Sequence, residues 1–131
     1  ENGGDINKIA DTPVDLPVIT DGAKVLELGA GAVPLPTIVS ATLGASVVAS
    51  DFQDDVLSLA ARNLNSNAVD DSQCVRLDWT DPMASEALQR TYDFVMGADI
   101  ISVHALYEAL ARTVFMASHE GTVFLLAFKE R

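Results

Sequence analysis

Short apolar runs bounded by turn residues alternate along the chain with longer stretches whose apolar residues recur at helical spacing. The runs predict strands at 24–28, 46–50, 74–78, 92–98 and 122–128, and the longer stretches predict helices at 34–44, 54–67 and 103–117. Strands that alternate with helices pair in parallel and are covered on both faces. The pattern therefore predicts an α/β fold, a Rossmann-like doubly wound sheet that is mostly parallel and has five visible strands.

Two of the predicted helices carry one apolar stripe each, which we expect to pack on the sheet. The stripe of the helix at 54–67 comprises Val56, Leu57, Ala60, Ala61 and Leu64, and Asp54 is placed to cap or charge its first turn. The stripe of the helix at 103–117 comprises Val103, Leu106, Tyr107, Leu110, Ala111 and Val114.

Length and composition predict one soluble domain. The 131 residues are 49% hydrophobic, which is enough for one core. Residues 1–23 are interpreted as a lead-in segment and residues 24–131 as the domain itself, because the apolar pattern begins at Lys24. No apolar run approaches the roughly 18 residues of a membrane span, and the first residues do not resemble a signal peptide.

Net charge and cysteine content limit the classes of binding partner and the cellular compartments that we expect for this protein. The single cysteine, Cys74, excludes a disulfide framework, so we expect a cytoplasmic protein, with the nucleus as the alternative. The formal net charge of −11 would repel a phosphate backbone, which argues against nucleic acid and favours a cationic ligand or a basic protein. His104 and His119 lack the spacing of a metal site, and no metal is expected.

The turn "GAG" after the first predicted strand indicates a nucleotide-binding site, but not one for a dinucleotide. Pro34 stands where a dinucleotide fingerprint has its third glycine, and Glu27 would repel a pyrophosphate while attracting an amine. Asp51 directly follows the second predicted strand, where a carboxylate accepts hydrogen bonds from ribose hydroxyls. A ligand with ribose and positive charge but no phosphate is therefore expected, and S-adenosylmethionine fits this description.

Four segments, "VLELGAG", "SDF", "RLDWTD" and "YDFVMGADII", resemble class I methyltransferases in their order and spacing. More narrowly, they resemble the seven-strand protein-lysine methyltransferases of the methyltransferase-like group, from about Val25 to the end of the chain. The resemblance implies that Asp51 binds the ribose of S-adenosylmethionine and that Asp78 and Trp79 border its adenine. It also implies that Ala98 lies beside the cofactor, and that the methionine end is held by Glu27, Gly29, Ala30 and Gly31.

Two of the candidate residues have a plainer alternative. Trp79, the only tryptophan, offers an indole face to an adenine, but it could instead anchor a loop to the core. Asp99 ends an apolar strand at the active edge of the sheet, and we interpret it as the residue that positions the methyl acceptor. The alternative for Asp99 is a helix N-cap.

The predicted activity is S-adenosylmethionine-dependent N-methylation, with a protein lysine as the acceptor. Ser102 stands where the family usually has an aromatic residue, so methylation of a small-molecule amine stays open, as does a non-catalytic cofactor-binding scaffold. A nicotinamide-dependent oxidoreductase would use a similar sheet, but Glu27 and Pro34 oppose it.

The last predicted strand would form a nearly all-apolar edge of the sheet. The resemblance implies an antiparallel hairpin beside this strand, and only five strands are predicted here. We therefore expect the chain to be a fragment of a longer enzyme, C-terminally incomplete, that can self-associate through Thr122 to Phe128.

Overall fold

The predicted sheet is present in a computed structural model, which describes residues 17–129. Five strands lie in the order β3-β2-β1-β4-β5, and every neighbouring pair is parallel. The strands are β1 (Lys24–Leu28), β2 (Ser46–Asp51), β3 (Cys74–Arg76), β4 (Tyr92–Ala98) and β5 (Ser118–Ala127). The strand order reverses between β1 and β4, so the ends of these strands form the crevice where α/β proteins bind ligands.

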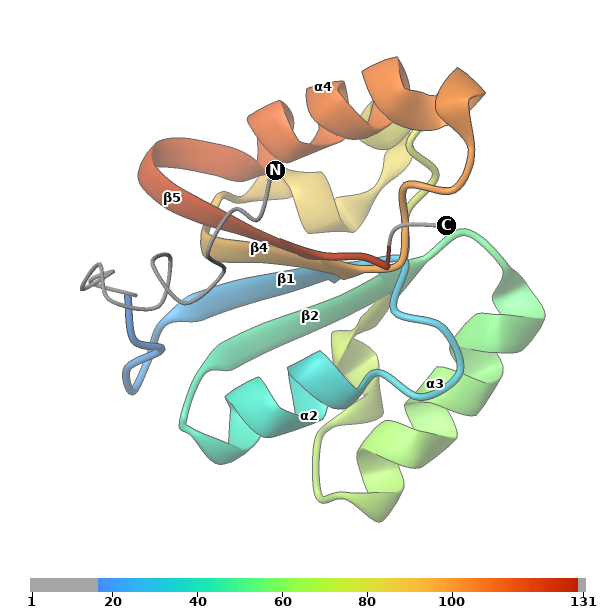
Figure 1. Cartoon of the computed structure of the whole chain (residues 1–131). Coiled ribbons are helices and arrows are strands. Elements are labelled where there is room, and N and C mark those ends of the chain that lie inside the picture. Colours follow the sequence, from blue (N-terminus) through green and yellow to red (C-terminus); the bar gives the residue numbers. More distant parts are fainter. Residues whose placement is uncertain (1–16, 130–131) are drawn as a thin grey trace, which may run out of the picture.

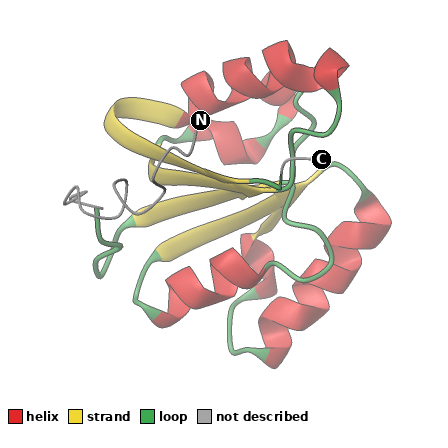
Figure 2. Ribbon diagram, in the orientation of Figure 1, coloured by secondary structure: helices red, strands yellow, loops and turns green. Residues whose placement is uncertain are grey.

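Helices cover both faces of the sheet, which confirms the doubly wound prediction. In Figure 1, α2 (Leu35–Thr42) and α3 (Asp54–Ser66) lie on one face and α4 (Tyr107–Ala117) lies on the other. Figure 2 shows the resulting three layers of helix, sheet and helix. Four short 3-10 helices complete the described elements: η1 (Asp71–Gln73), η2 (Pro82–Ala84), η3 (Glu86–Gln89) and η4 (His104–Leu106).

Each face of the sheet has its own hydrophobic core, because side chains alternate along a strand. Val25 of β1 packs with Val47, Phe94 and Leu64 on the side of α2 and α3. The hydrophobic core on the α4 side is larger and comprises Leu26, Leu28, Val48, Leu77, Ala87, Tyr92, Val95, Leu110 and Ala117. The central strand is therefore buried from Val25 to Leu28, since both of its faces are covered.

The predicted apolar stripe of the last helix was wrong in part. The α-helix begins at Tyr107, after the 3-10 turn η4, and its buried residues are Leu110, Thr113 and Ala117. Tyr107 and Ala111 are exposed. Both line an open hollow between α4 and Phe124 of β5, and so they are not covered by the sheet. Thr113 can be buried because its hydroxyl donates to the carbonyl of Ala109 at 2.8 Å.

Asp54 charges the first turn of its helix and does not cap it. The N-cap of α3 is Gln53, whose side chain makes no capping hydrogen bond, and Asp54 and Asp55 follow in the first turn. Their carboxylates interact favourably with the positive end of the helix dipole.

The last strand lies at the edge of the sheet, as expected from its position in the sequence. Only β4 pairs with β5 among the described residues, and Phe124, Leu125 and Phe128 are 38%, 37% and 59% exposed. Self-association through this edge remains a prediction. Within residues 17–129, no helix combines the length and the apolar character needed to cross a bilayer.

A hydrogen-bonded histidine fastens the start of β5 to β4. The Nε2 atom of His119 lies 3.0 Å from the Asp93 carboxylate, and Nδ1 lies 2.6 Å from the carbonyl of Glu120. Both neighbours are acceptors, so the geometry favours the doubly protonated imidazolium. The Glu120 carbonyl and then Asp93 raise the pKa of His119, and the amide of Lys24 and then His119 lower the pKa of Asp93.

We expect His119→Gln to lower the melting temperature at about pH 5.5 and to have a smaller effect at about pH 9. Because folding raises the pKa of His119, its protonated form stabilises the fold fully when the pH is below 6.5, the pKa in the unfolded chain. This stabilisation is lost as the pH rises through the pKa in the folded protein. Because the pKa of Asp93 is lowered, its carboxylate stabilises the fold above pH 3.8, and this stabilisation is lost only in acid. Thermal melting at both pH values measures the difference, and equal effects at the two would contradict the ion pair.

Candidate functional site

A cavity of about 400 Å³ opens at the carboxyl ends of the strands, a size typical of small-molecule sites. Four of the predicted site residues line it: Gly29, Asp51, Asp78 and Trp79. Its remaining lining comes from Phe52 after β2, Leu77 and Thr80 after β3, and Ile100, Ser102, Val103 and Leu106 after β4. The loops after β1, β2, β3 and β4 therefore converge on one site.

The glycine turn is held against the neighbouring strand. The Ala30 amide donates to the carbonyl of Ser50 at 2.8 Å, and the Gly31 amide donates to Asp51 Oδ2 at 3.1 Å. Gly29 and Gly31 have φ values of +59° and +68°, in the left-handed region that favours glycine. The turn is thus held in place by hydrogen bonds, and a ligand can approach its backbone closely because the glycines have no side chain.

Glu27 lies in β1, two residues before the glycine turn, and is buried. Its side chain is 3% exposed, and its Oε1 accepts hydrogen bonds from the hydroxyl of Thr37 at 2.8 Å and from the Thr37 amide at 3.2 Å. Burial raises the pKa of Glu27 to about 7, although the hydrogen bonds from Thr37 oppose the rise. Glu27 is not among the residues that line the cavity, so its predicted contact with the methionine end of the cofactor stays a prediction.

The beginning of α2 has no amide to offer a pyrophosphate. Pro34 and Pro36 lack an N–H, and the amide of Leu35 donates to Val33 at 2.8 Å. The next two amides, of Thr37 and Ile38, donate to Glu27 and to Pro34. A dinucleotide site uses the free amides of this helix end, so the structure opposes the nicotinamide-dependent alternative for the same reason as the sequence.

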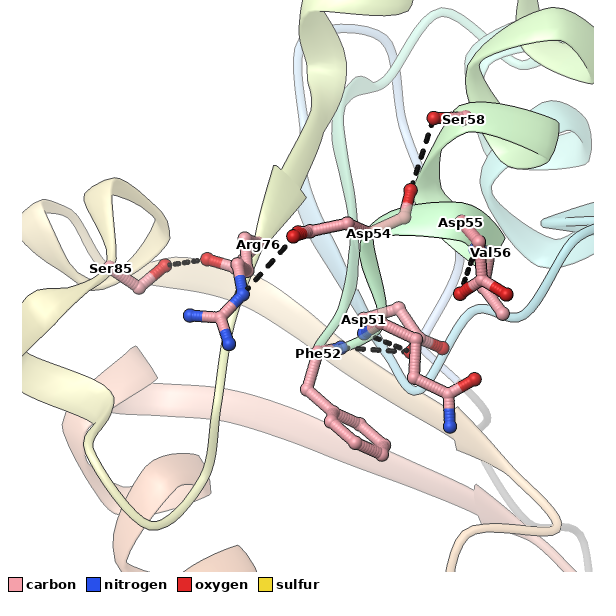
Figure 3. A network of polar contacts seen from close by, with 9 residues as sticks. Asp51, Phe52, Asp54, Asp55, Val56, Ser58, Arg76 and Ser85 are labelled. Carbon is pink, nitrogen blue, oxygen red and sulfur yellow. Dashed lines mark hydrogen bonds and ion pairs between the residues drawn. The ribbon is translucent and has the colours of Figure 1, made fainter.

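Asp51 joins two of the loops that form the cavity. Besides Gly31, it accepts hydrogen bonds at Oδ1 from the amides of Phe52 at 2.8 Å and Gln53 at 3.2 Å (Figure 3). A carboxylate has about four lone-pair sites, so one acceptor site remains for a ligand hydroxyl. Figure 3 also shows the ion pair between Arg76 Nε and the Asp54 carboxylate. The two atoms are 3.5 Å apart, and both side chains are exposed.

The loop after β3 presents an ionised acid and an indole to the cavity. Asp78 Oδ1 accepts from the hydroxyl of Thr80 at 2.7 Å and from its amide at 2.9 Å, and these bonds lower the pKa of Asp78. Trp79 is half-buried, packs against the core on the α4 side and lines the cavity at the same time. The two interpretations of Trp79, core anchor and ligand contact, are therefore compatible.

Asp99 and Ala98 precede the lining residue Ile100 in the chain but do not line the cavity. Asp99 has φ +57°, and its amide donates to the carbonyl of Ala127 at 2.7 Å. The N-cap alternative for Asp99 was wrong, because η4 and α4 begin after Val103 and Leu106. Ala98 lines a separate hollow on the α2 face with Pro36 and Leu125, so its place beside the cofactor stays a prediction.

Several lining residues were not predicted, above all Phe52 and Ile100. Phe52 is a 56% exposed aromatic residue directly after Asp51, and this position at the active edge was the signal that could have found it. Ile100 approaches Gly29 so closely that a Cβ added at Gly29 would lie 2.7 Å from its Cγ2. That contact joins two loops distant in sequence, so no local pattern reports it.

The charge of the site suits a cation. Asp51 and Asp78 line the cavity, and no lysine, arginine or histidine does so among the described residues. No group of three or more metal-ligating side chains occurs in residues 17–129. Two carboxylates, aromatic faces and a close-approach turn fit a ligand with ribose, a base and positive charge, as S-adenosylmethionine has.

Comparison with known proteins gives this site a family context. A family model described as "Lysine methyltransferase" matches residues 12–131. EEF1A lysine methyltransferase 3 of Xenopus tropicalis is 34% identical over 107 residues, which cover 79% of this chain and 46% of that protein. Protein N-lysine methyltransferase METTL21A of the same species is 35% identical over 113 residues, or 83% of this chain and 50% of that protein. The chain thus spans about half the length of these relatives.

Among solved structures, the glycopeptide N-methyltransferase MtfA complexed with S-adenosylmethionine is similar, with a TM-score of 0.62 and 23% identity. The match covers 92% of this chain and 51% of that one. At this identity the likeness shows the fold alone, and the predicted Rossmann-like methyltransferase fold is confirmed.

Proposed function

Since the chain belongs to the lysine methyltransferase family, we propose that the whole protein transfers a methyl group from S-adenosylmethionine to the side-chain amine of a protein lysine. One observation carries the proposal: the family match includes every residue that lines the cavity at the ends of β1 to β4. The names of two relatives, a lysine methyltransferase for EEF1A and a protein N-lysine methyltransferase, support a protein as the acceptor.

The chain's own residues suit the proposed cofactor. Asp51 would hold the ribose, Phe52 and Trp79 would offer aromatic faces to the adenine, and Gly29 would allow close approach of the methionine end. When bound, S-adenosylmethionine supplies a methyl group on a positively charged sulfur that is a good leaving group. The protein must then exclude water and hold the acceptor in line, at about 3 to 3.5 Å from the methyl carbon.

The β4 side of the cavity suits a lysine. Val103 and Leu106 are apolar and Ser102 is polar, which matches an acceptor with an apolar stem and a polar tip. A lysine amine has a reference pKa near 10.4 and must lose its proton before it can attack, and apolar surroundings favour that loss. Asp99 lies just after β4, two residues beyond Gly97, which pairs with Leu28. We propose that its carboxylate orients the lysine amine, although Asp99 does not line the cavity.

A small-molecule amine and a non-catalytic scaffold are the other candidate functions. Ser102, which is small, exposed and part of the cavity lining, does not by itself select a protein acceptor. Incubating the protein with radiolabelled S-adenosylmethionine and a cell extract separates the three. Label in protein lysine supports the proposal, label only in small molecules supports the amine, and binding without transfer to any acceptor supports the scaffold.

We expect Asp51→Ala to weaken S-adenosylmethionine binding about 5- to 150-fold, as for a lost hydrogen bond to a charged group worth about 1 to 3 kcal/mol. Asp54→Ala is the matched control, since Asp54 is an exposed carboxylate three residues away whose ion pair with Arg76 contributes little. Isothermal calorimetry measures both dissociation constants, and thermal melting shows that each variant folds. Equal affinities of the two variants would remove Asp51 from the site.

A further inference from the structure

The loop between β4 and η4 forms one wall of the cavity. Ile100, Ser102 and Val103 line the cavity, and Ile100 and Ile101 pack against the core on the α4 side. The facing wall consists of residues after β2 and β3, which strand pairing and the hydrogen bonds of Asp51 and Asp78 hold in place. The position of the β4 loop therefore sets the width of the cavity.

Hydrogen bonds hold this loop at its two ends and at its centre, and the central one comes from a side chain. At its two ends, the Asp99 amide donates to Ala127 at 2.7 Å and the Leu106 amide donates to Val103 at 3.0 Å. At its centre, the hydroxyl of Tyr107 donates to the carbonyl of Ile101 at 2.8 Å. That carbonyl belongs to the peptide bond that joins Ile101 to Ser102, so the tyrosine holds the loop next to the residue that faces the cavity.

Tyr107 is well placed to hold the β4 loop in position. It is the first residue of α4, which is anchored on the sheet by buried Leu110 and Ala117. Its ring lies against His104, with centroids 4.8 Å apart and planes tilted by 35°. Tyr107 does not itself line the cavity, so it would act through the loop and not on the ligand.

We propose that Tyr107 is a positioning residue for the methyl acceptor: by holding the Ile101 carbonyl, it fixes Ser102 and Val103 at the acceptor side of the cavity. The inference rests on the proposed function, because it assigns the β4 wall to the acceptor and the walls after β2 and β3 to the cofactor. Methyl transfer demands placement of the acceptor to within a fraction of an ångström, so a looser wall lowers turnover without displacing the cofactor.

Tyr107→Phe tests this with a matched control in Tyr92→Phe. Tyr92 also donates its hydroxyl to a carbonyl, that of Ala87 at 2.7 Å, but it is buried in the core away from the cavity. We expect Tyr107→Phe to lower kcat/KM for a lysine acceptor about 3- to 10-fold with an unchanged dissociation constant for S-adenosylmethionine. Amides of residues 100–106 should exchange with solvent faster in this variant.

The control should behave in the opposite way. Tyr92→Phe leaves a buried carbonyl without its partner, so we expect a lower melting temperature with unchanged kcat/KM and unchanged exchange in residues 100–106. Exchange and kcat/KM of Tyr107→Phe that match the wild type would overturn the inference, as would an equal loss in both variants. If the wild-type protein methylates no lysine, the proposed function fails, and the exchange comparison still decides whether Tyr107 holds the loop.

Discussion

Replacing Gly29 with alanine is expected to weaken S-adenosylmethionine binding at least tenfold and to destabilise the fold. Gly29 has φ +59°, a conformation that costs a residue with a Cβ about 1 to 2 kcal/mol. The added Cβ would also lie 2.7 Å from Ile100 Cγ2 and 3.8 Å from Trp79 Cζ2. Ile100 must therefore move, and it carries the β4 wall of the cavity with it.

Gly121→Ala separates the two causes. Gly121 also has a positive φ, +95°, but a Cβ added there meets no atom within 4 Å, and the residue lies in β5 away from the cavity. We expect both variants to melt at lower temperature and Gly29→Ala alone to lose affinity. Calorimetric titration with S-adenosylmethionine gives the result, and normal affinity in Gly29→Ala would show that the cofactor does not approach this turn.

Replacing Glu27 with glutamine is expected to stabilise the protein by about 3 kcal/mol at pH 8 and to have little effect near pH 4.5. The pKa of Glu27 rises from 4.5 in the unfolded chain to about 7 in the fold, so the folded state holds the proton more tightly. Stability therefore falls as pH rises from 4.5 to about 7, and the full cost is present above that range. Glutamine is nearly isosteric and keeps an oxygen that can accept both hydrogen bonds from Thr37.

Urea unfolding of both proteins at several pH values measures this effect as a difference in the free energy of unfolding. His119 also makes stability fall as pH rises, but it is present in both proteins and cancels in the comparison. Glu108→Gln is the control, because the Glu108 side chain is 87% exposed. Parallel pH profiles for the wild type and Glu27→Gln would show that Glu27 does not carry a raised pKa.

Glu27 illustrates how a correct residue can have an incomplete interpretation. Its place two residues before Gly29 marked it as part of the site. The structure shows that its carboxylate is buried on the α2 face and bonded to Thr37, ten residues further along the chain. A role in holding α2 against the glycine turn could not be predicted, because burial of the carboxylate depends on how α2 packs on the sheet.

The sequence alone determined the fold class and the edge of the sheet that carries the site. Alternation of apolar runs with helical spacing is a local property, and parallel pairing with helices on both faces follows from it. The same reasoning located Gly29, Asp51 and Trp79, because each directly follows a predicted strand and all carboxyl ends of parallel strands meet at one edge. Asp78, the last residue of the strand predicted at 74–78, was implied by the family resemblance.

Only the tertiary structure decided which of these side chains face one another. The contact of Gly29 with Ile100, the bond from Tyr107 to the Ile101 carbonyl and the buried face of α4 all depend on packing between distant segments. A helical period specifies that one face is apolar, but the packing of α4 on the sheet decided that Leu110 and Thr113 are buried and Ala111 is exposed. Periodicity is fixed by neighbours along the chain, whereas cavity width and pKa are fixed by neighbours in space.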